Sequence, residues 1–209
     1  MTSHKGKTVG TGRLFLNEAL QKNRREVLML GGAGLLGGLM TQNVEGAERR
    51  QAKFKVLGEN DRIDIGNKGN DIIEKAYKLG FELEKKHGGC ARCTVAALQK
   101  SIEFVPGNKA LFRTASCLDG GATPRGVQNC GAFTGSGMVI GWVCGNEKFG
   151  NTRLSHKLIR KVYERFEAEY GSVLCKDVRT KANKDCPKVV GTAAKWTAEV
   201  LLRQFTEYE

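Results

Sequence analysis

The stretch Cys130-Gly131-Ala132-Phe133-Thr134-Gly135 opens an uncharged run that continues to Cys144. Glycines stand four residues apart in two sets in and next to this run: Gly131 and Gly135, then Gly137, Gly141 and Gly145. This spacing predicts a helix with one face stripped of side chains, which lets a neighbouring helix or a cofactor approach the backbone closely. Because the run carries no charge, we expect the helix to be buried all round.

Outward from this run, apolar residues recur at helical spacing on both sides. The clearest case begins after Thr152, where Leu154, Leu158, Val162 and Phe166 form one stripe. No segment shows the alternation typical of a strand. The sequence therefore predicts an all-α protein, a compact bundle of about six helices with a glycine-rich loop before the buried helix. The expected helices are 71–86, 90–104, 109–118, 131–144, 152–170 and 187–205.

Seven cysteines stand in a chain of 209 residues, which is long enough to bury a core without disulfides. Cys90 and Cys93 form a C-x-x-C at the start of a predicted helix, and Cys130, Cys175 and Cys186 also lie at predicted helix ends. Helix starts stabilise thiolates and offer free N–H groups to an anionic cluster. The pattern indicates a cysteine-ligated or cysteine-redox site.

The remaining two cysteines fit this pattern less well. Cys144 would stand about 21 Å from Cys130 along one helix at 1.5 Å per residue, so we expect it to be a small buried hydrophobe. The sequence leaves two roles open for Cys117, which either fills space in the core or acts as a ligand. A zinc ribbon is disfavoured because a second C-x-x-C is missing, and a c-type haem site because Thr94 follows Cys93 where histidine would be needed.

The first 46 residues have the three-part order of an export signal. Arg24-Arg25 precedes an uncharged run of fourteen residues, Val27 to Met40, and a short polar segment follows. The arginine pair resembles the twin-arginine type, which carries folded proteins across the membrane. The run falls short of the roughly 20 residues that span a bilayer. We expect an export signal over 1–46, an extended leader over 47–70 and a helical cysteine-rich redox domain over 71–209.

The formal net charge of +12 favours acidic partners. Because an exported protein seldom meets nucleic acid, we expect no nucleic-acid partner and favour an acidic redox protein instead. The positive charge is also consistent with binding to an anionic membrane surface, or with compensation for a negatively charged cofactor. We expect the mature chain, periplasmic or on the outer face of the cytoplasmic membrane, to carry no transmembrane helix.

Cys93-Thr-Val-Ala-Ala-Leu98, Cys130-Gly-Ala-Phe-Thr-Gly135, Gly171-Ser-Val-Leu-Cys175 and Cys186 before the last helix occur in the order of a known family pattern. Over residues 71–205 the chain resembles the C-GCAxxG-C-C family of redox-active proteins. Split-Soret cytochromes are similar exported proteins that carry an iron–sulfur cluster in addition to haem. That similarity, together with the glycine-faced helix, suggests a homodimer.

The resemblance implies an iron–sulfur cluster on Cys93, Cys130, Cys175 and Cys186, with no haem. Gly131 and Gly135 would bring N–H groups near the sulfurs and so belong to the cofactor site. Cys90 departs from the family pattern and either replaces or assists Cys93, and Cys117 is a further candidate ligand.

Three functions follow, and whether the protein is an enzyme stays open. The first is exported electron transfer through the cluster. The second is thiol–disulfide exchange by Cys90 and Cys93, with Cys130, Cys175 or Cys186 as resolving partner. The third is a non-catalytic binding module in which disulfides staple the loops.

Overall fold

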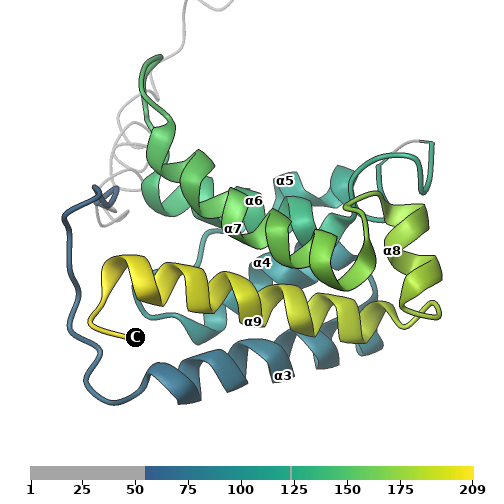
Figure 1. Cartoon of the computed structure of the whole chain (residues 1–209), viewed down its shortest axis with the longest axis horizontal. Coiled ribbons are helices and arrows are strands. Elements are labelled where there is room, and N and C mark those ends of the chain that lie inside the picture. Colours follow the sequence, from purple (N-terminus) through teal and green to yellow (C-terminus); the bar gives the residue numbers. More distant parts are fainter. Residues whose placement is uncertain (1–54, 123) are drawn as a thin grey trace, which may run out of the picture. The chain divides into compact units, whose positions relative to one another are not determined.

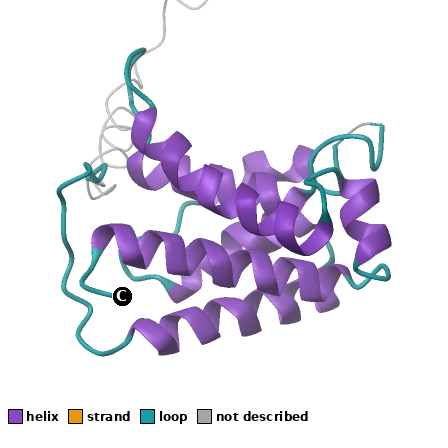
Figure 2. Ribbon diagram, viewed as in Figure 1, coloured by secondary structure: helices purple, strands orange, loops and turns teal. Residues whose placement is uncertain are grey.

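The computed structural model describes residues 55–122 and 124–209, which lie in the second of the two units into which the chain divides, Lys53–Glu209. Figure 2 shows that this part of the chain is helical and without strands, which confirms the predicted all-α class. The elements are α3 (Gly69–His87), α4 (Cys90–Ser101), α5 (Lys109–Thr114), the 3-10 helix η1 (Ala115–Leu118), α6 (Gly131–Cys144), α7 (Arg153–Tyr170), α8 (Cys175–Lys181) and α9 (Cys186–Phe205).

All six expected helices are present, with three differences. The segment 109–118 divides into α5 and η1, and α4 ends at Ser101 because Ile102 takes an extended backbone that buries its side chain. A seventh α-helix, α8, was not expected. It has seven residues, of which only Cys175 and Val178 are buried, so it is too short to show helical periodicity in the sequence.

Helices α3 and α9 form the long antiparallel pair of the bundle, and Figure 1 shows α9 lying between α3 and α7. Their backbones approach closely where two glycines meet the opposite helix. A Cβ at Gly80 would lie 3.0 Å from the Val190 carbonyl oxygen, and one at Gly191 would lie 2.9 Å from the Tyr77 carbonyl oxygen. The pairing of small residues thus sets the distance between the two helices.

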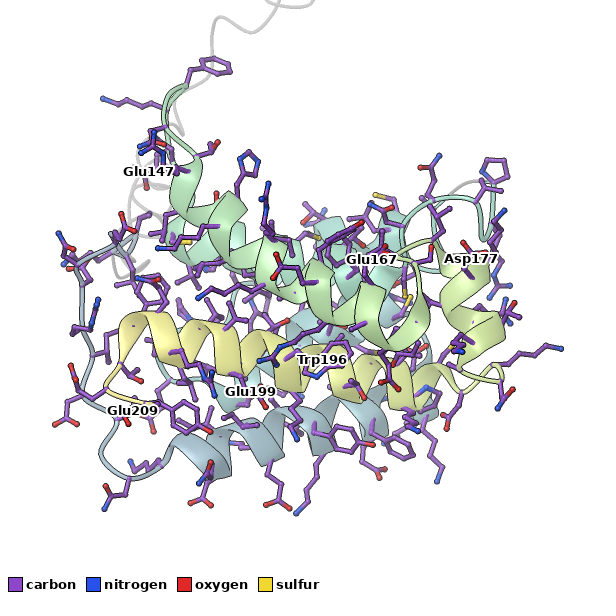
Figure 3. The ribbon with its side chains drawn as sticks, viewed as in Figure 1. Glu147, Glu167, Asp177, Trp196, Glu199 and Glu209 are labelled. Carbon is purple, nitrogen blue, oxygen red and sulfur yellow. The ribbon has the colours of Figure 1, made fainter. Side chains whose placement is uncertain are left out.

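Aromatic rings join α7 to its neighbours. Phe166 is fully buried, and its ring meets Phe133 of α6 and Trp196 of α9 edge to face at centroid distances of 5.6 and 5.5 Å. Figure 3 labels Trp196 on α9. Edge-to-face pairs add about 0.5–1.5 kcal/mol each to the burial of the rings. The stripe predicted from the sequence therefore forms the contact of α7 with the bundle.

The uncharged helix α6 packs with its glycine face on α4. A Cβ at Gly135 would lie 2.7 Å from the Ala91 carbonyl oxygen, so only glycine allows this approach. The expectation of burial all round holds for one side only, because residues 133, 134, 137 and 138 are half-buried and Gly141 is exposed. Since α4 of the same chain covers Gly131 and Gly135, that part of the glycine face is not free to meet a second copy.

Residues 55–68 form no helix or strand, but they are attached to the bundle. The Leu57 N–H donates to the Val143 carbonyl at 2.9 Å, and the Ile63 N–H donates to the Phe205 carbonyl at 2.6 Å. In the part of the chain that the structure covers, no helix combines the length and apolarity needed to cross a membrane. The predicted export signal, 1–46, lies outside the described residues.

Candidate functional site

Four cysteines stand where helices begin. Cys90 is the first residue of α4, Cys175 of α8 and Cys186 of α9, and Cys130 immediately precedes α6 as its N-cap. Cys90, Cys130 and Cys186 were expected at helix starts, and the structure confirms this. Cys175 was expected only to follow the end of the helix 152–170, because α8 was not predicted. We call Cys90, Cys130, Cys175 and Cys186 the four-cysteine site. In Figure 1 this end of the bundle lies on the side of α8.

A short backbone ladder brings two of these helix starts together. Asn129 and Leu174 form an isolated antiparallel bridge. The Cys130 N–H donates to the Val173 carbonyl at 2.7 Å, and the Cys175 N–H donates to the Gln128 carbonyl at 2.9 Å. The starts of α6 and α8 are therefore fixed side by side by main-chain hydrogen bonds.

The glycine-rich loop completes the site. Gly121 has a φ of 76°, and a Cβ there would lie 2.6 Å from the Cys175 Cβ, so the loop can pass this close to α8 only with glycine. The neighbouring Gly120 N–H donates to the Cys90 sulfur at 3.4 Å. A Cβ at Gly131 would collide with the Cys90 sulfur. The glycines of this region thus make room for sulfur atoms.

Cys90 and Cys130 share a hydrogen bond between their side chains. This bond, together with the Gly120 N–H, lowers the pKa of Cys90 to about 7 in spite of burial. The same bond and burial raise the pKa of Cys130 well above its usual value. Cys130 is therefore the donor of the pair, and Cys90 is the thiol that ionises first, with a pKa close to neutral pH.

The other two thiols are close enough to act electrostatically on this pair. Burial raises the pKa of Cys175, and the charges of Cys90 and Cys186 raise it further. Burial also raises the pKa of Cys186, which Arg179 lowers through its charge and a hydrogen bond. Ionisation of one thiol in the four-cysteine site thus disfavours ionisation of the others, and a cation or a metal would relieve this.

Cys93 has different surroundings. Its thiol donates to the Gly88 carbonyl at 3.3 Å and contacts the Glu84 carboxyl. Burial, followed by the charge and hydrogen bond of Glu84, raises the pKa of Cys93 to about 12. Burial likewise raises the pKa of Glu84. Cys93 is therefore a neutral thiol next to a carboxyl group, whereas Cys90 is the cysteine of this pair that meets Cys130.

The last two cysteines lie elsewhere. Cys144 ends α6, is buried, and donates to the Ile140 carbonyl at 3.2 Å, which confirms it as a buried hydrophobe. Cys117 is exposed and donates to the Thr114 carbonyl at 3.5 Å. All seven cysteines are free thiols.

Two residues that the sequence did not single out shape the site. Asp119 caps α4 from the distant loop, accepting from the Ala91 N–H at 2.8 Å and from the Arg92 Nε at 2.8 Å. Arg179 stands beside Cys186 and lowers the pKa of Cys175 as well. Neither had a local signal, because Asp119 acts on a helix start far away in the sequence and Arg179 lies in a generally basic segment.

The thiol set suits an iron–sulfur cluster by its chemistry, since such clusters take four cysteine thiolates. Among the described residues, no three His, Cys, Asp or Glu side chains converge on a point that one metal ion could occupy. A cluster takes its thiolates on different iron atoms, so it does not require convergence on one point. The donor number and type fit the group.

The comparisons bear on the same residues. One family profile, described as "Putative redox-active protein (C_GCAxxG_C_C)", matches residues 89–200, which include the four-cysteine site and Cys93. No curated protein and no solved structure matches the chain. The matched span begins one residue before Cys90 and covers more than half of the chain. The chain belongs to the C_GCAxxG_C_C family, whose description is consistent with a redox role.

Proposed function

We propose that the protein transfers electrons through an iron–sulfur cluster held by Cys90, Cys130, Cys175 and Cys186. The observation that carries this proposal is that four thiols, each at the start of a different helix, interact electrostatically at one end of the bundle. A bound cluster would supply a one-electron redox couple.

The surroundings of the four thiols favour a negatively charged group. Helix starts point backbone N–H groups and the positive end of the helix dipole toward the sulfurs. Arg125 and Arg179 lower the pKa of Cys175, and Arg179 also donates to Cys186. Cys90, Cys130 and Cys175 are 8%, 4% and 3% exposed, so the protein keeps water away from most of the site. Low exposure to water and hydrogen bonds to sulfur are what tune the potential of such centres.

Cys90 takes the place of Cys93 in this ligand set. The two residues lie in the first turn of α4, and Cys90 is the one that meets the Gly120 N–H, the Cys130 thiol and the α6 backbone at Gly131. Cys93 instead contacts Glu84 and Gly88. Gly131 and Gly135 contribute by leaving room for the Cys90 sulfur and the α4 backbone.

The sequence and the charge of the chain support a proposed location and a proposed kind of partner. Arg24-Arg25 before an apolar run supports export of the folded, loaded protein, because a cluster inserted in the cytoplasm would survive only that route. The excess of Lys and Arg over Asp and Glu, which remains without residues 1–46, and the arginines beside the site favour an acidic redox partner.

A second candidate is thiol–disulfide exchange by Cys90 and Cys130, favoured by their hydrogen bond and the lowered pKa of Cys90. The Cys90 thiolate would attack one sulfur of a partner's disulfide and release the other as a thiolate. Cys130, after losing its proton, would then attack Cys90, closing a Cys90–Cys130 disulfide and freeing the partner's second thiolate. The partner is reduced by two electrons and this chain is oxidised by two.

One experiment separates the candidates. The protein is purified without oxygen, and iron and acid-labile sulfide are counted per chain. Cys90→Ser, Cys130→Ser, Cys175→Ser and Cys186→Ser should each lose most of both, whereas Cys93→Ser and Cys144→Ser should retain them. Wild-type protein without iron and sulfide, together with a Cys90–Cys130 disulfide found by mass spectrometry after oxidation, would favour the second candidate. Loss in Cys93→Ser with retention in Cys90→Ser would contradict the ligand set.

A further inference from the structure

A pocket of about 810 Å³ lies on the side of α4 that carries Cys93. The end of α3, the outer surface of α4 and the start of α5 form its walls. Its size is within the range of roughly 300–1,000 Å³ that is usual for small-molecule sites. The family description names no ligand for this pocket.

The pocket wall is cationic. Arg92, Lys100 and Lys109 line it, and no carboxylate does. Arg92 is paired with Asp119 through its Nε, while Lys100 and Lys109 form no ion pair with any described residue. Two ammonium groups from different helices, one from the last turn of α4 and one from the first turn of α5, are thus available to an anion.

The remaining wall is apolar. Leu83, Ala96 and Phe112 contribute carbon surface, and Phe112 keeps 39% of its surface exposed. An apolar surface with a few convergent charges is what a ring compound with a negatively charged group requires. A purely inorganic anion would leave the Phe112 ring in water, and an uncharged apolar molecule would leave the two lysines without a partner.

We propose that this pocket binds a small organic anion with an apolar ring system. The ring would lie against Phe112 and Leu83, and the anionic group would lie between Lys100 and Lys109. Cys93 lines the pocket one turn from Cys90, a rise of about 4.5 Å along the helix, so the bound molecule would stand beside the four-cysteine site. The inference does not require a cluster at that site.

The probe for the test is 8-anilinonaphthalene-1-sulfonate, titrated into the full chain and followed by its fluorescence. N-phenyl-1-naphthylamine has the same rings without the sulfonate and serves as the uncharged comparison. We expect the double variant Lys100→Glu and Lys109→Glu to weaken sulfonate binding about tenfold, and Phe112→Ala to weaken binding of both probes.

The matched control is Lys161→Glu with Lys195→Glu, which makes the same charge change at exposed positions on α7 and α9, away from the pocket. It should leave the dissociation constant within about twofold. Equal weakening by the control pair would mean that only net charge matters, and unchanged binding by Lys100→Glu with Lys109→Glu and by Phe112→Ala would place the probe elsewhere. Either result overturns the inference. Far-ultraviolet circular dichroism melts of all variants confirm that they are folded.

Discussion

The Cys130 thiol donates a hydrogen bond to the Cys90 sulfur, although one residue begins α4 and the other caps α6. The bond divides the pair into an acidic thiol, Cys90, and a thiol that holds its proton, Cys130. This asymmetry is a property of the tertiary structure, because the two residues belong to different helices. It has direct consequences for reactivity.

Alkylation of Cys90 in the metal-free protein should follow a titration midpoint near pH 7, the pKa of Cys90. Cys130→Ala removes the donor that stabilises the thiolate, so the midpoint should rise toward that of an ordinary cysteine, about 8.5. The measurement is the pH dependence of iodoacetamide labelling, read on the Cys90 peptide by mass spectrometry. Cys144→Ala should leave the midpoint unchanged; a midpoint unaffected by Cys130→Ala would speak against the hydrogen bond.

Cys144 should make the protein less stable in alkali. Burial raises its pKa from 9.0 to about 11, so the folded state holds the proton longer than the unfolded state. The stabilisation that this provides is complete below pH 9 and is lost as the pH rises to about 11. Cys144→Ala should reduce the loss of unfolding free energy between pH 8 and 11 by on the order of 1 kcal/mol, measured by urea denaturation. An identical pH profile in wild type and variant would refute this assignment.

Gly131→Ala and Gly141→Ala should have opposite effects although both lie in α6. A Cβ at Gly131 collides with the Cys90 sulfur and approaches the Leu118 carbonyl oxygen, so this variant should lose about 1–3 kcal/mol of stability and disturb Cys90. A Cβ at Gly141 meets no atom within 4 Å, so this variant should be neutral or gain up to about 1 kcal/mol from helix propensity. Chemical denaturation measures both, and equal changes in stability for the two variants would contradict the role of the sulfur contact at Gly131.

Asp119 should be required for the start of α4. Asp119→Ala removes the acceptor of the Ala91 and Arg92 N–H groups and should cost about 1–2 kcal/mol. Asp119→Asn keeps an oxygen acceptor and should retain most of the stability while losing the ion pair with Arg92. Thermal melts of the two variants measure the loss of stability. An equal loss in Asp119→Asn and Asp119→Ala would contradict the capping role of Asp119.

Arg24→Lys with Arg25→Lys should keep the protein in the cytoplasm of a bacterium that has a twin-arginine export system. Arg49→Lys with Arg50→Lys makes the same change in an arginine pair without a following apolar run, and should leave export intact. Cell fractionation followed by immunoblotting measures both. Export of both variants would remove the support for a twin-arginine signal.

The positions of the helices were predictable because burial is periodic along the chain. The apolar stripe of α7 and the uncharged composition of α6 predict helices at these two segments. They do so without reference to the elements on which the helices pack. The seven residues of α8 carry too little of this periodicity. The split between α5 and η1 also lacks a sequence signal, because both have mostly exposed residues.

The membership of the four-cysteine site was predictable in part. Cys130 and Cys186 stand next to predicted helix starts, and a helix start is a local feature. Cys175 was predicted only to follow the end of a helix, because α8 was not expected. Whether Cys90 or Cys93 stands beside Cys130 is not local, since both occupy the first turn of α4. The rotation of α4 decides it, and this depends on the close contact of Ala91 with Gly131 and Gly135.

By itself, then, the amino-acid sequence determined the all-α class, the approximate positions of six helical segments and the placement of Cys90, Cys130 and Cys186 at helix starts, because these depend on neighbours within a turn or two. Only the tertiary structure decided that Cys90 pairs with Cys130, that Cys93 faces Glu84, and that Asp119 caps α4. Such contacts join residues from different elements, and their geometry is set by how closely glycine lets two backbones approach.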